Sequence, residues 1–355
     1  MSPLTFSQDM DQRTEAVLEK IIVHYIETAE PIGSRALSKT LKPKLSAATI
    51  RNIMADLTDM GLIKQPHTSA GRLPTDLGYR HYINALFSQG EITPFEYKNQ
   101  NLRDTQEGQP TRLEDILVSV SRELSKITNC TSIAIPPTPA ISKLNKIEFI
   151  KLSIKQILAV IVTQLGMVHN RVIYLQETPD QETLDKMGRI LIDLFERRTF
   201  STIRQSILND FKDVRYTHSK LIASAIHLGK KAFEVDTPSE LFVLGHSKFC
   251  SFPEFKDQER LEIVYKLLEE KTALSNILAD IMEKEGVQIQ IGKENNNHSL
   301  YKCSVVASTY GDKGKQLGSI GIVGPTRINY PKIIAAIDYS AQKLSFSLRQ
   351  FLDHN

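Results

Sequence analysis

The residues with the most evident chemistry lie in segments 46–52 and 66–72, close to the start of the chain. The first segment reads Ser-Ala-Ala-Thr-Ile-Arg-Asn. Its Arg51 can pair with N7 and O6 of guanine, and its Asn52 with N6 and N7 of adenine, while the small residues before them permit close approach to a groove floor. The second segment is polar, rich in hydrogen-bond donors, and contains Gly71. These residue types are typical of a surface that reads duplex DNA.

The placement of charge supports this interpretation. The formal net charge is only +3, from 44 basic and 41 acidic residues, and such a value alone does not indicate a nucleic-acid binder. Residues 31–55 and 60–75, however, contain no acid. Their basic side chains are Arg35, Lys39, Lys42, Lys44, Arg51, Lys64 and Arg72, with His67 among them. A near-neutral region with one acid-free basic face suits phosphate binding, and the alternative is an ordinary solvated surface.

Apolar spacing predicts three short helices that would position these side chains. The first covers residues 11–28, the second is capped by Ser34, and the third is capped by Ser46 and buries Ile50, Met54 and Leu57. Two brief strands around a polar loop follow, and a further helix starts at 74–75. This order predicts a winged helix-turn-helix over residues 1–88, with the third helix as the recognition helix.

The remainder of the chain predicts an α+β architecture. Polar residues 89–111 favour a linker, and an amphipathic helix follows over 112–128. β-rich segments come early (132–135, 147–152, 156–163, 168–175) and late (240–244, 287–291, 300–308, 316–323), with helical spacing between them and at 332–351. One α+β domain interrupted by a mainly helical insertion would give this order, and so would two consecutive small domains.

Several classes of protein are disfavoured by what the sequence contains. Its three cysteines, Cys130, Cys250 and Cys303, are widely spaced, which argues against a zinc site or a disulfide framework and fits a reducing cytoplasm. The acidic start does not resemble a signal peptide, and the longest apolar run, 157–162, is too short to span a membrane. No phosphate-binding glycine loop or nucleophile elbow is present. We therefore expect no catalysis, no cofactor and no bound metal.

Longer motifs resemble one known family. They are Pro31-Ile32-Gly33-Ser34-Arg35, the segment 46–57, Gln65-Pro66-His67-Thr68-Ser69-Ala70-Gly71-Arg72, Gly78-Tyr79-Arg80, and Gly318-Ser319-Ile320-Gly321-Ile322-Val323-Gly324-Pro325 with Arg327 and Tyr330. On these segments the chain resembles the HrcA family of heat-inducible transcription repressors. The resemblance covers both ends of the chain, while the middle matches only in its general pattern of helical and β-rich segments.

The resemblance implies a multidomain α+β protein. Its expected parts are a winged-helix DNA-binding domain over 1–88, a linker over 89–111, a GAF-like domain made of 112–178 and 241–355, and an inserted dimerising segment over 179–240. It also implies a homodimer that binds an inverted-repeat operator and a GroEL-type chaperonin that maintains its activity. The DNA-binding residues expected from motif and chemistry together are Ser34, Arg35, Lys39, Ser46, Ala48, Thr49, Arg51, Asn52, His67, Thr68, Ser69, Gly71 and Arg72.

Two other functions are compatible with the same pattern. A GAF-like domain that binds a metabolite would make the chain a ligand-sensing regulator, although no polar groups in the sequence identify such a pocket. A winged helix that binds another protein would need none of the DNA contacts, so substitution of Arg51 or Arg72 would leave DNA affinity unchanged.

Overall fold

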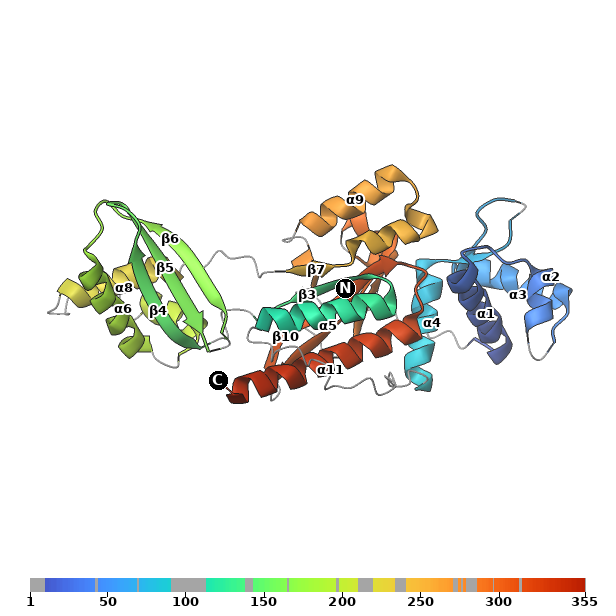
Figure 1. Ribbon diagram of the computed structural model, residues 1–355. Coiled ribbons are helices and arrows are strands. Elements are labelled where there is room, and N and C mark those ends of the chain that lie inside the picture. Colours follow the sequence, from blue (N-terminus) through green and yellow to red (C-terminus); the bar gives the residue numbers. More distant parts are fainter. Residues whose placement is uncertain are drawn as a thin grey trace.

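The computed structural model describes residues 10–41, 44–68, 70–90, 113–137, 143–164, 166–195, 198–209, 220–233, 241–270, 274–275, 277–278, 286–295, 297–312 and 315–354. Figure 1 shows three units in a row. We name them the N-terminal unit (10–90), the central unit (113–137 with 241–354) and the inserted unit (143–233). The linker expected at 89–111 lies outside the described residues except for Gln89 and Gly90.

The N-terminal unit is a small helical bundle with a pair of short strands. Its elements are α1 (Gln12–Thr28), α2 (Ser34–Thr40), α3 (Ala47–Asp59), β1 (Ile63–Lys64), β2 (Leu73–Pro74) and α4 (Asp76–Gln89). The two strands pair antiparallel, and an isolated bridge joins Ile32 to Arg72. Each helix buries one apolar face, as the spacing predicts, and α3 buries Ile50, Met54 and Leu57.

The central unit is built on an antiparallel sheet with the strand order β7-β3-β10-β9-β8. These strands are β3 (Thr131–Ile135), β7 (Phe242–Leu244), β8 (Gln288–Ile291), β9 (Cys303–Asp312) and β10 (Lys315–Pro325). Helices α5 (Leu113–Thr128) and α11 (Tyr330–His354) cover one face, and α9 (Gln258–Glu269) lies over the other (Figure 1). Alternate residues therefore serve two cores: Ile320 and Ile322 face α5 and α11, while Val305 and Ala307 belong to the α9 side.

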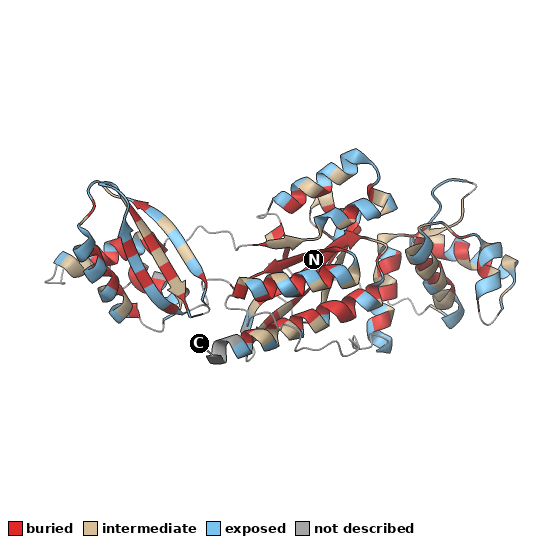
Figure 2. Cartoon of the chain, viewed as in Figure 1, coloured by how far each residue is buried: buried red, intermediate tan, exposed pale blue. Residues whose placement is uncertain are grey.

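The inserted unit has a sheet and a core of its own. Strands β4 (Leu144–Lys151), β5 (Gln156–Thr163) and β6 (Val168–Tyr174) form a separate three-stranded antiparallel sheet. Helices α6 (Gln181–Phe195), α7 (Phe200–Asn209) and α8 (Lys220–Phe233) share one hydrophobic core with it. Figure 2 shows buried residues both on these helices and on the strands of this sheet, in agreement with one shared core.

The boundary expected after residue 178 is wrong. It assigns β4, β5 and β6 to the same domain as β3, but these strands make no ladder with the five-stranded sheet and instead pack against α6. Ile173 of β6 and Leu184 of α6 lie in one core, so a boundary between them would cut that core in two. The insertion thus begins before β4 and ends after α8, and it connects the neighbouring strands β3 and β7.

Candidate nucleic-acid interface

Helix α3 presents the expected polar residues on its outer side. Ser46 is the N-cap: its hydroxyl accepts a hydrogen bond from the Thr49 amide at 3.0 Å and lies 2.8 Å from the Thr49 hydroxyl. This cap fixes the start of the helix and leaves Ala48 exposed beside it. Arg51 and Asn52, one turn further on, are also exposed and lie opposite the buried stripe. The geometry therefore leaves a guanidinium and an amide free to meet base edges.

Helix α2 packs against α3 and carries two exposed basic side chains, Arg35 and Lys39. Ser34, expected as the cap of this helix, is instead its first residue, and the N-cap is Gly33 without a side-chain hydrogen bond. The hydroxyl of Ser34 is therefore not used to start the helix. Such a short helix crossing beside a recognition helix is a suitable place for phosphate contacts.

The loop between β1 and β2 projects from the N-terminal unit (Figure 1). His67 and Thr68 are exposed near its tip, and Ser69 lies outside the described residues. Gln65, which belongs to the motif 65–72 but not to the expected DNA-binding residues, holds the loop: its side-chain amide donates to the Thr68 carbonyl at 2.8 Å and to the Ala70 carbonyl at 2.9 Å. This amide closes the loop from within and leaves the His67 and Thr68 side chains outward.

Gly71 and Arg72 anchor the loop to the body of the unit. The Ile32 amide donates to the Arg72 carbonyl at 3.0 Å, and the Arg72 amide donates to the Ile32 carbonyl at 2.8 Å. A Cβ on Gly71 would lie less than 3.0 Å from the Ile32 backbone, so glycine is required here by close backbone approach rather than by a tight turn. Arg72 is half-buried, and its Nε donates to the Thr58 hydroxyl at 3.3 Å, which ties the loop to α3.

The electrostatics of this surface follow from which groups lack partners. Among the described residues, none of Arg35, Lys39 and Arg51 makes an ion pair with a carboxylate. The nearest acids on α3 are both exposed: Asp56 lies one turn beyond Asn52, and Asp59 lies about two turns beyond Arg51. Unpaired exposed cations are available to phosphates, and the counterions that they release contribute to affinity for a polyanion.

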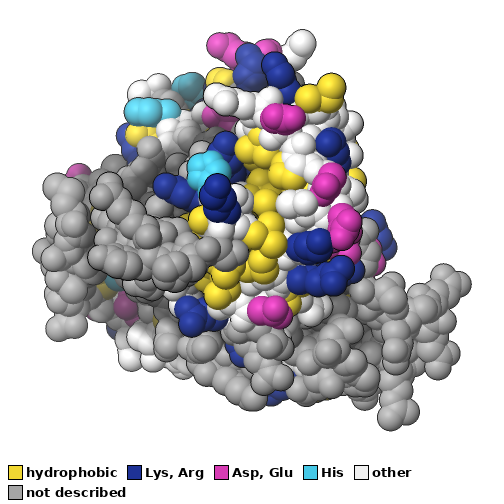
Figure 3. Space-filling view, turned by 90° about the vertical axis from the view of Figure 1, so that its left-hand side faces the viewer, with side chains coloured by type: hydrophobic (Ala, Val, Ile, Leu, Met, Phe, Trp, Pro, Cys, Tyr) yellow, Lys and Arg dark blue, Asp and Glu magenta, His cyan; other side chains and the backbone are white. Residues whose placement is uncertain are grey.

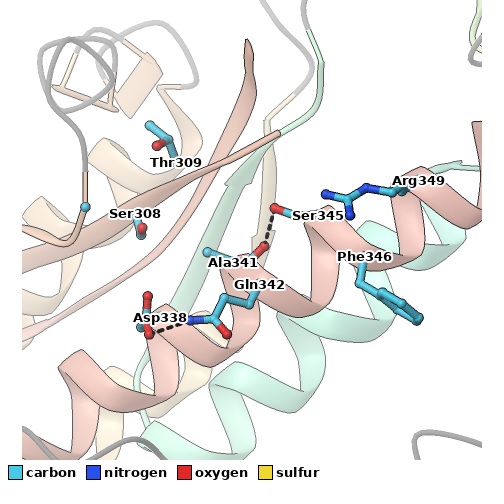
Figure 4. A pocket seen from close by; sticks show the side chains of 9 residues that line it. Ser308, Thr309, Asp338, Ala341, Gln342, Ser345, Phe346 and Arg349 are labelled. Carbon is cyan, nitrogen blue, oxygen red and sulfur yellow. Dashed lines mark hydrogen bonds between the residues drawn. The ribbon is translucent and has the colours of Figure 1, made fainter. Parts of the chain in front are cut away.

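A groove elsewhere bears on the ligand-sensing alternative. It measures about 440 Å³, lies between α11 and the end of β9, and is shown in Figure 4. Its polar groups largely bond within the chain: Gln342 donates to Asp338 at 2.8 Å, and the Ser345 hydroxyl donates to the Ala341 carbonyl and accepts from the Gly311 amide. Groups that are already paired do not converge on a ligand, so the groove gives the alternative little support.

The described residues contain no group of three or more histidine, cysteine, aspartate or glutamate side chains arranged to hold a metal ion. Within the same part of the chain, no helix combines the length and apolar character that crossing a bilayer requires.

Comparison with known proteins identifies the family of the chain. The family model of the HrcA protein C-terminal domain matches residues 114–334. The heat-inducible transcription repressor HrcA of Geobacter sulfurreducens is 36% identical over 337 residues, which cover 95% of this chain and 98% of the relative. That of Syntrophobacter fumaroxidans is 32% identical over 344 residues, covering 96% and 98%.

A solved structure shares the fold. A crystal structure known only as that of a hypothetical protein aligns with a TM-score of 0.63 at 23% identity, covering 96% of this chain and 99% of its own. Because a family model and full-length relatives agree on one assignment, the chain belongs to the HrcA family of heat-inducible transcription repressors, which are negative regulators of transcription and not a class of enzymes.

Proposed function

We propose that this chain represses heat-shock genes by binding an inverted-repeat operator as a homodimer. The N-terminal unit would act as a winged helix, with α3 in the major groove and the loop 65–72 as the wing. The observation that carries the proposal is the exposed surface of residues 34–52, a segment without acids, on which Arg51 and Asn52 of α3 lie beside the basic residues of α2.

The expected contacts divide into two classes. Arg51 and Asn52, with Ala48 and Thr49 permitting close approach, would read base edges. Ser34, Arg35, Lys39 and Ser46 would hold phosphates and set the register. The wing, with His67, Thr68, Ser69 and Arg72, would reach backbone or minor groove. Arg72 already bonds Thr58 through Nε, so its remaining nitrogens would make that contact.

Dimerisation through the inserted unit is supported by an uncovered apolar sheet face. Register pairs place Ile150 beside Leu158 and Leu158 beside Val172 on one side of the sheet, and Val162 beside Val168. Ile150, Val168 and Val172 are 41%, 49% and 42% exposed, because they lie on the side of the sheet away from the helices. An antiparallel sheet normally carries polar residues on its free face, so this face suits a second copy of the chain.

The view from the inserted end agrees with an exposed apolar surface. Figure 3 shows apolar side chains gathered in a strip among Lys, Arg, Asp and Glu side chains. An apolar centre bordered by charged groups is the usual anatomy of a protein–protein interface.

Control by a GroEL-type chaperonin belongs to the same proposal and rests on family membership. Its physical requirement is that the native dimer forms slowly or is only marginally stable, because only then would a folding helper set the active concentration. Rapid and complete unassisted refolding of the purified dimer at growth temperature would contradict this part.

The test is a gel-shift titration at fixed salt. It compares the inverted repeat upstream of the host's chaperone operon with a scrambled duplex, with and without chaperonin and ATP. Selective binding supports the repressor, and an increase with chaperonin supports the folding control. Folded protein that binds both duplexes alike would contradict operator recognition. Thermal stabilisation by a metabolite would instead favour the ligand-sensing alternative.

A further inference from the structure

Several polar contacts join the N-terminal and central units, and their residues are not among those expected to bind DNA. Arg80 of α4 donates from Nε to one carboxylate oxygen of Glu294 at 2.8 Å and from Nη2 to the other. The same Nη2 donates to the Ile289 carbonyl at 2.7 Å. One guanidinium thus joins the two units by a bidentate ion pair and a backbone bond.

These contacts cover an unpaired strand edge. β8 is the last strand in the order of the central sheet, and Ile289 and Ile291 belong to it. The Ile291 amide donates to Glu294 at 2.9 Å, so the Arg80–Glu294 pair satisfies one carbonyl and one amide of that edge strand. An edge left open is a template for unwanted pairing, and α4 here takes the place of the missing strand.

A second contact fixes the start of the same helix. The Asp76 carboxylate, in the first turn of α4, accepts from the Lys293 amide at 3.1 Å. Gly292 has φ +53°, and a Cβ there would meet the Asp76 carboxylate. The backbone of residues 292–293 and the Asp76 side chain are therefore fitted to each other.

A third contact lies at the end of α1. Arg327 is ion-paired with Glu254 of the central unit, and its Nη1 donates to the Ile26 carbonyl at 2.9 Å. The side chains of Arg327 and Glu254 are only 12% and 22% exposed, so solvent screens them less than a surface pair. Nearby, the rings of Tyr79 and Tyr330 lie 5.7 Å apart across the same interface.

We propose that these contacts form an interdomain clamp that determines which spacing of operator half-sites the dimer accepts. The proposal rests on the proposed function, since it assumes a dimer with two DNA-binding units. The N-terminal unit is attached to the central unit at two points, the end of α1 and the length of α4. With two points fixed, the N-terminal unit cannot swivel about either point alone. One hydrophobic cluster contains residues of α1, α3 and α4 and continues into α5, α11 and the central sheet, so fixing α1 and α4 also fixes α3. Arg80 and Arg327 are positioning residues that touch no DNA.

The experiment uses full-length protein and duplexes selected by the wild type from a random library. The release variant is Arg80→Ala with Arg327→Ala, and the conservative variant is Arg80→Lys with Arg327→Lys. The matched control is Lys266→Ala, which removes a 2.7 Å ion pair with Glu262 inside α9. Each protein is titrated against the selected duplex, duplexes with one, two or five base pairs added at the centre, and a single half-site.

The clamp predicts a change in spacing preference without a change in half-site affinity. For the wild type and the control, added base pairs should remove the avidity gain, a loss on the order of 10²-fold. The release variant should lose about tenfold or less, because unclamped units reorient to reach both half-sites. The lysine variant, which keeps the charges, should fall between them. Spacing preference equal to the wild type's in the release variant, or uniformly tighter binding to every duplex, would overturn the proposal.

Hydrogen exchange separates failure of the clamp from failure of the proposed function. In the release variant, the Ile291 and Lys293 amides should exchange faster, while amides of β9 keep their protection. Unchanged exchange at both amides overturns the clamp whatever the DNA results. If the wild type selects no duplex at all, operator binding fails, and the exchange data still decide whether the clamp exists.

Discussion

At the scale of single residues, the proposed DNA-binding surface and the interdomain interface use arginine differently. Arg51 is exposed and unpaired, whereas Arg80 and Arg327 are partly buried and bonded to carboxylates and carbonyls. Residue type and a charge count cannot separate them, since each is one arginine and counts as one positive charge. Arg51 therefore has the freedom to read a base, and the other two hold structure.

Substitutions of Arg51 and Lys39 should affect DNA binding in different ways if α3 contacts bases and α2 contacts phosphates. Arg51→Ala should cost about 1–3 kcal/mol of binding and relax specificity at one base pair. Lys39→Ala should weaken all sequences alike and reduce the salt dependence by about one phosphate contact. Titrations against operator and scrambled duplexes at several salt concentrations measure both effects. Unchanged selectivity in Arg51→Ala would show that α3 is not the reading helix.

Two neighbouring tyrosines, whose rings are tilted by 51° to each other, should respond oppositely to removal of their hydroxyls. The Tyr79 hydroxyl is buried and has no hydrogen-bond partner among the described residues, so Tyr79→Phe should leave stability unchanged or raise it by about 1 kcal/mol. The Tyr330 hydroxyl donates to the Thr326 carbonyl and lies 2.7 Å from the Ser304 hydroxyl. Tyr330→Phe should therefore cost about 1–3 kcal/mol, measured by urea unfolding.

Buried tyrosines should also make the protein sensitive to alkali. Burial raises the pKa of Tyr79, Tyr310 and Tyr330 above the ordinary value of about 10. The unfolded chain therefore loses these protons first, so stability is constant below about pH 10 and falls above it, by about 1.4 kcal/mol per pH unit for each tyrosine. Urea unfolding between pH 8 and 11 measures the slope. Tyr79→Phe should reduce the slope, and Tyr174→Phe, at a side chain 67% exposed, should not.

At the scale of elements, the loop 65–72 is positioned by backbone contacts that a motif does not reveal. Its sequence predicts a polar hairpin loop, but the pairing of residues 71 and 72 with Ile32 joins segments that are distant in sequence. The side-chain amide of Gln65 and the hydroxyl of Thr58 complete the support. The loop should therefore depend on residues that touch no ligand.

Gly71→Ala tests that support. The new Cβ would overlap the Ile32 backbone, which cannot move aside as a flexible side chain can, so we expect a loss of about 1–3 kcal/mol and weaker DNA binding. Gly33→Ala is the matched control, because no atom lies within 4 Å of its Cβ position. Thermal unfolding and gel shifts on both variants give the answer. Equal, small effects would show that the loop tolerates displacement.

At the scale of the whole molecule, the sequence predicted most elements but not their grouping. Apolar spacing placed α3 and α11 close to their observed bounds, because periodicity is a local property. Assigning β4 to β6 to a sheet is not local: Ile173 and Ile133 look alike in sequence, yet one packs on α6 and the other on the α9 side. Apolar spacing does not delimit α7 within the helical region before residue 240, and the partners of Arg80 lie more than 200 residues away.

A dimer formed through the free sheet face should be sensitive to one charge. Val172→Glu would bring two carboxylates together across a symmetric interface, so the dissociation constant should rise by at least about tenfold. Sedimentation equilibrium measures the change. Lys186→Glu, on an exposed turn of α6 where Lys186 pairs with Glu182, is the control and should leave assembly intact. A Val172→Glu protein that remains as dimeric as the wild type would place the interface elsewhere.

The hydrogen-bonded pairing of Ala134 with Phe242 means that the inserted unit leaves and rejoins the sheet at adjacent points. It is therefore a cassette inside a β-hairpin, and removing it need not separate any strand from its neighbour. A tight turn joining Ile135 to Leu241 should yield a shorter chain whose central core still folds and whose DNA-binding unit is still clamped. Such a chain would keep half-site affinity while losing avidity, and the excised cassette could be used to pair unrelated domains.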